Sequence, residues 1–214
     1  MAWTMWKKNA VLGIDIGSRN INVVLTQIDA SNKIQVKNIG AALTEGCQRG
    51  KIASSEKLKQ AVSGAVKKVA QSTDKDLKAF VNIPLFQTKS IVTSATIDIR
   101  SYNPISSQVK LMCLNQAKNS IRSNTHTIVH VIPTGFWIDG QYILDPIGKK
   151  GKVLKGQVLV ILCETELLRQ LWAIYTDLKI NVLGFVYDSV ALKELLLLDG
   201  YREQNILIID CWLR

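Results

Sequence analysis

The chain has 214 residues, of which 47% are hydrophobic and 21% charged, and its formal net charge is +10. This composition is typical of globular proteins and excludes a disordered chain. No apolar run approaches the ~18 residues that a spanning helix needs, so we expect no transmembrane helix.

The four cysteines show no close pairing, which favours reduced, mostly buried thiols over disulfides. His126 and His130 have no thiol or carboxylate beside them in the sequence, so we expect no metal centre. The sequence also has no Ser-His-Asp arrangement, paired-carboxylate site or reactive-cysteine context, and we expect no catalytic residues of these kinds.

The positive charge lies in short clusters, such as Lys67-Lys68, without interleaved aromatic residues. A solvated basic surface is therefore the first interpretation, an anionic membrane surface the second, and nucleic acid the third; we expect no nucleic-acid partner. Trp3 and Trp6 stand beside Lys7 and Lys8 and could touch a membrane interface. The two tryptophans are explained more simply as half-exposed aromatic residues of an irregular terminus, so we expect any membrane contact to be peripheral. The first residues do not form a secretory signal, because their charges follow the apolar residues.

The first expected elements are strands at 11–16 and 21–28, joined by a tight polar turn. Such a hairpin tip points backbone N–H groups and a small hydroxyl into a concavity that suits a phosphate. The carboxylate at the end of the first strand suits Mg²⁺ held through water. The candidate phosphate and magnesium residues are Asp15, Gly17, Ser18 and Arg19.

A third strand is expected at 34–41, and Ser54 then caps a helix that keeps apolar residues at helical spacing to about Gln71. A strand follows at 79–83 and ends at Pro84. Three strands, a helix and a strand are the opening of an actin-type, ribonuclease H-like half-domain.

The pattern changes after Pro84. The expected elements are a strand at 89–99, a helix at 105–122, a strand at 126–132 that stops at Pro133, a hairpin at 136–144 turning at Gly140, a basic loop at 148–156 and a strand at 157–163. They predict a small α+β subdomain inserted between two parts of the first.

The first pattern then returns with a helix at 164–178 and a strand at 181–186. A leucine-rich helix follows, capped by Asp188 or Ser189 and ending near Asp199-Gly200, and the last strand is expected at 205–210. The predicted fold class is α/β, a partial actin-like domain with an inserted α+β subdomain.

The order of these elements resembles the FtsA family, the actin-like cell-division proteins of bacteria. The Gly13–Ser18 and Gly46–Gly50 segments match two of its glycine motifs. The most specific match is the run from Val129-His130-Val131-Ile132-Pro133 through Ile138-Asp139 to Asp145-Pro146-Ile147-Gly148, which in that family lies in the inserted, SHS2-like subdomain 1C. The pilus-assembly family PilM shares the fold and the insertion, and it is kept as an alternative.

The resemblance implies that residues 1–84 and 164–214 form subdomain 1A and that residues 85–163 form subdomain 1C. It implies ATP and Mg²⁺ in the full-length family. The second phosphate motif of that family, Asp-x-Gly-Gly-Gly-Thr, would start at Asp210, which we add to the residual phosphate and magnesium site. Here the chain reads Asp210-Cys211-Trp212-Leu213. We expect a chain truncated at this motif, with Cys211–Arg214 read in a shifted frame, no tightly bound nucleotide and no enzymatic activity.

The inserted subdomain mediates self-contacts and contacts with late division proteins in the family. The residues that we expect to carry such an interaction are Phe136, Trp137, Lys149, Lys150 and Lys152. A contact with FtsZ is doubtful because the subdomain that binds it in the family has no counterpart in the sequence.

The expected function is thus that of a truncated, FtsA-like interaction module of the division machinery. It would lie in the cytoplasm, or at the inner face of the membrane at the division site. Two alternatives stay open: a PilM-like platform protein, and an ATP-binding actin-like protein completed by another chain.

Overall fold

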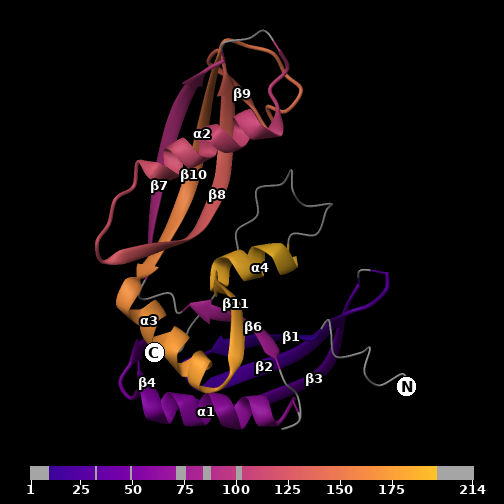
Figure 1. Cartoon of the computed structure of the whole chain (residues 1–214), viewed down its shortest axis with the longest axis vertical. Helices are drawn as coiled ribbons and strands as arrows, with labels where there is room; N and C mark the ends of the chain where they lie inside the picture. Colours follow the sequence, from indigo (N-terminus) through magenta and orange to yellow (C-terminus); the bar gives the residue numbers. More distant parts are fainter. Residues whose placement is uncertain are drawn as a thin grey trace. The chain divides into compact units, whose positions relative to one another are not determined.

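A computed structural model describes residues 10–31, 33–48, 50–70, 76–83, 88–99 and 103–196. The chain divides into two compact units, which we call unit 1 (Met1–Gln87 with Thr165–Arg214) and unit 2 (Thr88–Glu164). Figure 1 labels most elements of the two units.

Unit 1 is built on a five-stranded sheet in the order β11-β6-β1-β2-β3. Its strands are β1 (Ala10–Ile16), β2 (Asn20–Ile28), β3 (Ile34–Leu43), β6 (Leu77–Ile83) and β11 (Ile180–Tyr187). β1, β2 and β3 are antiparallel neighbours, whereas β6 and β11 run parallel to β1. The five strands expected in this unit before residue 190 are confirmed, with small shifts at their ends. This order and these directions make an actin-like half-domain.

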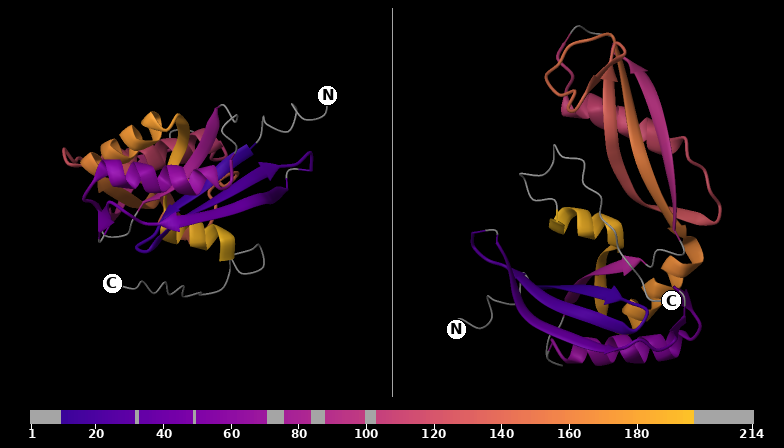
Figure 2. Two further views of the ribbon diagram at one scale, coloured as in Figure 1. Left: turned by 90° about the horizontal axis from the view of Figure 1, so that it is seen from below. Right: turned by 180° about the vertical axis from the view of Figure 1, so that it is seen from behind.

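One face of this sheet is covered by α1 (Ser55–Lys67) and α3 (Thr165–Asp177). α1 begins as expected, because the Ser54 hydroxyl accepts a hydrogen bond from the Lys57 N–H. The buried side chains of the sheet alternate along the strands, for example Leu12, Ile14 and Ile16 on β1, and they pack under these helices. α4 (Asp188–Leu196) lies on the other side of the sheet from α1, against β11 (Figures 1 and 2).

A short hairpin of β4 (Cys47–Gln48) and β5 (Lys51–Ile52) precedes α1. Gly46 has a φ of 76°, and a Cβ there would lie 2.3 Å from the Ser54 carbonyl oxygen, so only glycine fits against the start of α1. Several expected features lie outside the described residues: Arg49, Gln71, Pro84, the end of the leucine-rich helix and the strand at 205–210.

Unit 2 is a four-stranded sheet in the order β7-β10-β8-β9 with one helix on it. The elements are β7 (Thr88–Asp98), α2 (Ser107–Asn119), β8 (His126–Ile138), β9 (Gln141–Ile143) and β10 (Val153–Glu164). α2 packs on β7 and β10 over a core that includes Cys113, Phe136, Leu154, Val158 and Val160. In the part of the chain that the structure describes, no helix is long and apolar enough to cross a membrane.

The prediction that the strand at 126–132 stops at Pro133 is wrong. β8 continues through Pro133 to Ile138, and its pairing with β10 shifts so that Pro133 opposes Val158 and Gly135 opposes Gln157. Thr134 is the extra residue of a β-bulge at this point. A bulge disrupts the ladder locally, which is where a proline without an N–H can be accommodated in a strand.

The expected loop at 148–156 is also shorter than predicted, because β10 already begins at Val153. Leu154 is fully buried beside Cys113, and Gly156 lies so close to α2 that a Cβ there would be 3.0 Å from the Cys113 sulfur. The glycine suggested a loop, but it is a strand residue that allows close helix packing.

Candidate functional site

The turn between β1 and β2 is a compact tip fixed by its own backbone. The Gly17 N–H donates to the Asn20 carbonyl at 3.0 Å, and a Cβ on Gly17 would lie 2.8 Å from that oxygen. Thr44 follows β3 and donates from its hydroxyl to the Gly17 carbonyl and from its N–H to the Arg19 carbonyl, both at 2.8 Å. The third strand therefore holds the tip in place.

Asp15 is half-buried at the end of β1, and two asparagine amides hold its carboxylate. Asn82 Nδ2 donates to one oxygen at 2.7 Å, and Asn22 Nδ2 donates to the other at 3.1 Å. The Asn82 side-chain oxygen also accepts from the Ile16 N–H at 2.7 Å. Asn82 is only 9% exposed, so it joins the ends of the parallel strands β1 and β6 through buried polar contacts.

Neither asparagine was identified from the sequence. The available signal was a lone amide inside the apolar run Ala79–Ile83, at the carboxyl end of a strand parallel to β1. Carboxyl ends of parallel strands meet at one sheet edge, where ligands bind in open α/β sheets. That rule would have placed Asn82 beside Asp15.

The tip brings Asp15, Gly17, Ser18 and Arg19 together on one hairpin. Ser18 and Arg19 are exposed and available to a phosphate, whereas the Gly17 N–H is already used inside the turn. A carboxylate that neutral amides hold in one orientation suits a hydrated Mg²⁺. Asp210 lies outside the described residues, so only the first of the two phosphate loops is described.

Of the residues expected to carry an interaction on unit 2, one is buried in the core and the others lie at the surface. Phe136 is 2% exposed in the core under α2, and the Lys110 ammonium lies 5.1 Å from its ring centroid. Phe136 is thus a core residue, and the prediction that it belongs to the contact surface is wrong. The bulge at Thr134 decides this, because it determines which side chains of β8 face α2.

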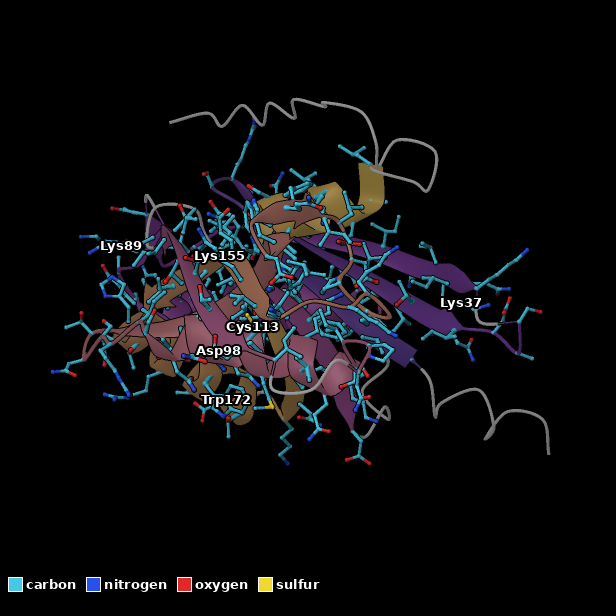
Figure 3. All side chains as sticks on the ribbon, turned by 90° about the horizontal axis from the view of Figure 1, so that it is seen from above. Lys37, Lys89, Asp98, Cys113, Lys155 and Trp172 are labelled. Atoms are coloured by element: carbon cyan, nitrogen blue, oxygen red, sulfur yellow. The ribbon has the colours of Figure 1, made fainter. Side chains whose placement is uncertain are left out.

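Trp137 points to the opposite face of the sheet from Phe136. Its ring meets that of Tyr142 edge-on, with centroids 5.5 Å apart, and the Lys155 ammonium lies 5.1 Å from the ring centroid. Lys155 opposes Thr96 on one side and Trp137 on the other, so the four side chains form one row across the sheet. Figure 3 labels Lys155 of this row and Cys113 of α2.

The loop that carries Lys149, Lys150 and Lys152 has a fixed backbone and exposed side chains. The Asp139 carboxylate accepts from the Lys152 N–H at 3.0 Å and from the Val153 N–H at 2.9 Å. The Ile105 N–H donates to the Lys149 carbonyl at 2.8 Å. This anchoring presents the three ammonium groups on an ordered loop. Unit 2 has nine Lys and Arg residues against four Asp and Glu, so its surface favours an acidic partner.

The described thiols have no features of a nucleophile. Burial raises the pKa of Cys47 and of Cys113, and it raises the pKa of Cys163 to about 12. These thiols are therefore protonated at neutral pH and act as small apolar groups. Among the residues that the structure describes, no three His, Cys, Asp or Glu side chains gather as a metal-binding group.

Comparisons with known proteins agree with this architecture. Residues 87–162 match the family described as the SHS2 domain inserted in FtsA. The chain is 23% identical to the cell division protein FtsA of Borreliella burgdorferi, over 95% of this chain and 50% of that protein. It is 25% identical to FtsA of Rhizobium meliloti, over 95% of this chain and 49% of that protein. The chain thus spans about half the length of the curated relatives that it matches.

Among solved structures, the chain is similar to the PilM-PilN type IV pilus biogenesis complex. The match has a TM-score of 0.58 at 12% sequence identity and covers 86% of this chain and 49% of that chain. At this identity the likeness concerns the fold alone. The sequence similarity to FtsA supports the FtsA resemblance above the PilM alternative.

Proposed function

Because this chain is similar to FtsA proteins along nearly its whole length, we propose that it acts in bacterial cell division as a protein-interaction module. The observation that carries the proposal is the match of residues 87–162 to the SHS2 domain inserted in FtsA. In this proposal residues 1–84 and 164–214 serve as subdomain 1A and residues 85–163 as subdomain 1C. The module works in the cytoplasm, including the inner face of the membrane at the division site.

The contact surface that we propose on unit 2 combines the ordered basic loop with the Trp137 row. Lys149, Lys150 and Lys152 supply charge, and Trp137 and Tyr142 supply a rigid aromatic surface. Aromatic residues and a charged rim are typical of protein interfaces. The partners are division proteins or a second copy of the module, and we do not assign a contact with FtsZ.

A charge-reversal experiment tests this surface. The triple variant Lys149→Glu/Lys150→Glu/Lys152→Glu of the full chain should no longer recover division proteins in a pull-down. A fluorescent fusion of this variant should no longer localise to the septum. The matched control Lys51→Glu/Lys57→Glu/Lys67→Glu reverses three exposed lysines of unit 1. Equal loss in both variants, or in neither, would contradict a role for the loop.

We propose that the hairpin tip at Asp15 binds Mg-ATP weakly and that the chain is not an enzyme. The described tip offers one carboxylate, one hydroxyl and one guanidinium, and a nucleotide held by its phosphates alone buries little apolar surface. Calorimetry with Mg-ATP should detect no affinity tighter than about 1 mM, which corresponds to ~4 kcal/mol. A micromolar affinity that Asp15→Asn abolishes would instead favour an actin-like ATPase completed by another chain.

The second candidate function is that of a PilM-like platform, and the similarity to the PilM-PilN complex favours it. Pull-downs distinguish the two functions directly. If the chain recovers pilus-assembly proteins and no division proteins, the PilM-like function is favoured and the cell-division proposal is wrong.

A further inference from the structure

Unit 2 has one long and regular edge strand, β7, whereas the other edge strands of the two large sheets are short or irregular. β7 pairs with β10 through all 11 of its residues without a register shift. β9, at the other edge of unit 2, has only 3 residues. In unit 1 the edge strands β3 and β11 both pair with a register shift, and the unpaired residue of β3 is Lys37.

Short strands, bulges and lysines are the features that prevent an edge from pairing with another chain. Between Ser90 and Ile97, β7 contains no charged residue, no proline and no bulge. In the described part of the chain, no strand pairs with its outer side. This edge is therefore open to a further strand.

The side chains of β7 are exposed on both faces of the sheet. Ile91 is 43% exposed on the face that carries α2, and Val92 is 59% exposed on the opposite face. Ala95 and Ile97 lie at the rim of the cores under α2 and are only half-buried. A helix docked on one face would cover one of these sets, whereas a strand added along the edge contacts both. We call Ile91–Asp98 the β7 edge.

A basic loop lies at the carboxyl end of β7. The Ile99 N–H donates to the Lys152 carbonyl at 2.7 Å, which joins this end of the strand to the loop that carries the three exposed lysines of the contact surface, Lys149, Lys150 and Lys152. Asp98 and Asp139 are the carboxylates nearby in the pairing, and Asp139 already accepts two loop N–H groups. The positive charge at this end attracts acidic residues.

We propose that an acidic, extended segment of a partner protein adds to the β7 edge as a further strand, with its acidic residues at the basic loop. This inference rests on the proposed function as an interaction module and names the chemistry of the partner. Main-chain hydrogen bonds to an open edge supply affinity, and alternate side chains supply specificity. The added strand would also extend the row of Thr96, Lys155, Trp137 and Tyr142.

The geometry of the sheet gives the order of residues in the partner segment. All strand pairs of unit 2 are antiparallel, and an antiparallel segment continues that ladder. The amino-terminal end of the segment then lies at the basic loop. Beside Ile91 and Val92 it needs β-branched, apolar residues. The expected segment is therefore acidic first and β-branched afterwards.

Charge argues against β7 of a second copy as the occupant. Unit 2 has nine Lys and Arg residues against four Asp and Glu, so pairing of two copies would bring two surfaces of the same sign together. β7 itself offers only Asp98 as an acidic residue to the basic loop. A segment from an acidic partner meets neither difficulty.

Peptide binding to the full chain tests the proposal. The probe is the fluorescein-labelled peptide Glu-Glu-Glu-Thr-Val-Thr-Ile-Thr-Val, and the wild type should raise its anisotropy saturably. Val92→Asp, or Thr96→Asp if the first variant fails to fold, places a like charge on the edge and should weaken binding at least ~tenfold. The matched control Val36→Asp changes a valine that is also 59% exposed, on the edge strand β3, and should bind as the wild type does. No saturable binding, or equal weakening in both variants, would overturn the proposal.

A charge exchange locates the acidic end of the peptide. Lys149→Glu/Lys150→Glu/Lys152→Glu should bind this peptide more weakly than the wild type, and it should bind Lys-Lys-Lys-Thr-Val-Thr-Ile-Thr-Val more tightly. If the variant binds both peptides as the wild type does, the basic loop does not contact the segment and the proposal is wrong.

Amide hydrogen exchange followed by NMR distinguishes strand addition from docking on a face of the sheet. The outward N–H groups of an antiparallel edge strand belong to alternate residues. Bound peptide should therefore slow exchange at every second residue of the β7 edge. Protection without this alternation, or only at other strands, would overturn the proposal.

Two further outcomes are decisive. If light scattering gives a dimer for the wild type and a monomer for Val92→Asp, a second copy occupies the edge and the proposal is wrong. Peptide binding at the edge without recovery of division proteins would support this inference and refute the proposed function alone. Recovery of division proteins by the wild type and by Val92→Asp alike, with no peptide binding, would refute this inference alone.

Discussion

The sheets of both units have helices packed on one face, and they differ in the side chains that the opposite face exposes. On the face of unit 2 opposite α2, one row consists of Thr96, Lys155, Trp137 and Tyr142, in which the aromatic rings contact each other and Lys155 lies over Trp137. In unit 1 the corresponding side carries isoleucine, leucine, valine and phenylalanine. The Trp137 row is suited to water or a polar partner, whereas an exposed apolar patch such as that of unit 1 is typical of a surface that binds another group.

The helix-covered faces should behave alike, and breaking them should have the largest effect. Leu12 in unit 1 and Leu154 in unit 2 are both fully buried. Leu12→Ala and Leu154→Ala should each lower the free energy of unfolding by about 2–5 kcal/mol, because each leaves a cavity. Urea denaturation followed by circular dichroism measures both, and a loss below ~1 kcal/mol in either would contradict a tightly packed core at that site.

Substitutions in the polar cluster of Asp15, Asn22 and Asn82 in unit 1 should have the second-largest effect on the free energy of unfolding. Asn82→Ala removes the acceptor of the buried Ile16 N–H and one donor to Asp15, and an unsatisfied buried group costs about 1–3 kcal/mol. Asn22→Ala removes a single exposed contact and is the matched control, with a smaller loss. Equal losses in urea denaturation would show that Asn82 has no special structural role.

The aromatic row of unit 2 should contribute less to the free energy of unfolding than the polar cluster of unit 1. Lys155→Met keeps the aliphatic stem but removes the charge over Trp137, and it should cost about 0.5–1 kcal/mol. The control Lys152→Met changes an exposed lysine whose backbone, not its side chain, forms the loop contacts. If both variants unfold at the same urea concentration as the wild type, the cation–π contact is not stabilising.

The smallest effect should be a pH dependence at the edge of unit 2. The Lys110 ammonium donates to Asp145 at 3.0 Å and holds the pKa of that carboxyl below its ordinary value of 3.8. The contribution to stability is present above the pKa of the unfolded carboxyl and is lost as the pH falls through the lowered folded pKa. Carboxyl NMR titration should show the pKa of Asp145 rising in Lys110→Met, and an unchanged pKa would exclude the ion pair as its cause.

The sequence was informative wherever the pattern is local. Strand alternation, the Ser54 cap and the polar turn after Ile16 predicted the order of elements in unit 1, because periodicity and capping depend on neighbouring residues. The run from His130 to Gly148 identified the family resemblance. In the structure its polar residues Asp139 and Asp145 accept hydrogen bonds from loop N–H groups and hold the loop backbone in place.

The sequence failed where contacts between distant segments decide the outcome. Pro133 and Gly156 have the local character of breaks, yet both lie inside strands, because a bulge opposite β10 and the close approach of α2 accommodate them. Phe136 and Trp137 are adjacent in the sequence but lie on opposite faces of the sheet. Only the register of β8 against β10 assigns one to the core and the other to the surface.

The sequence by itself determined the fold class, the insertion of one unit into another and the hairpin tip with Asp15, since these follow from local pattern and chain order. Only the tertiary structure decided that Asn82, 67 residues away, holds the Asp15 carboxylate. It also decided that the apolar residues of β2, β3 and β6 form one exposed surface. Both results arise from the pairing of strands that are distant in sequence, and burial and hydrogen bonding depend on that pairing rather than on residue type.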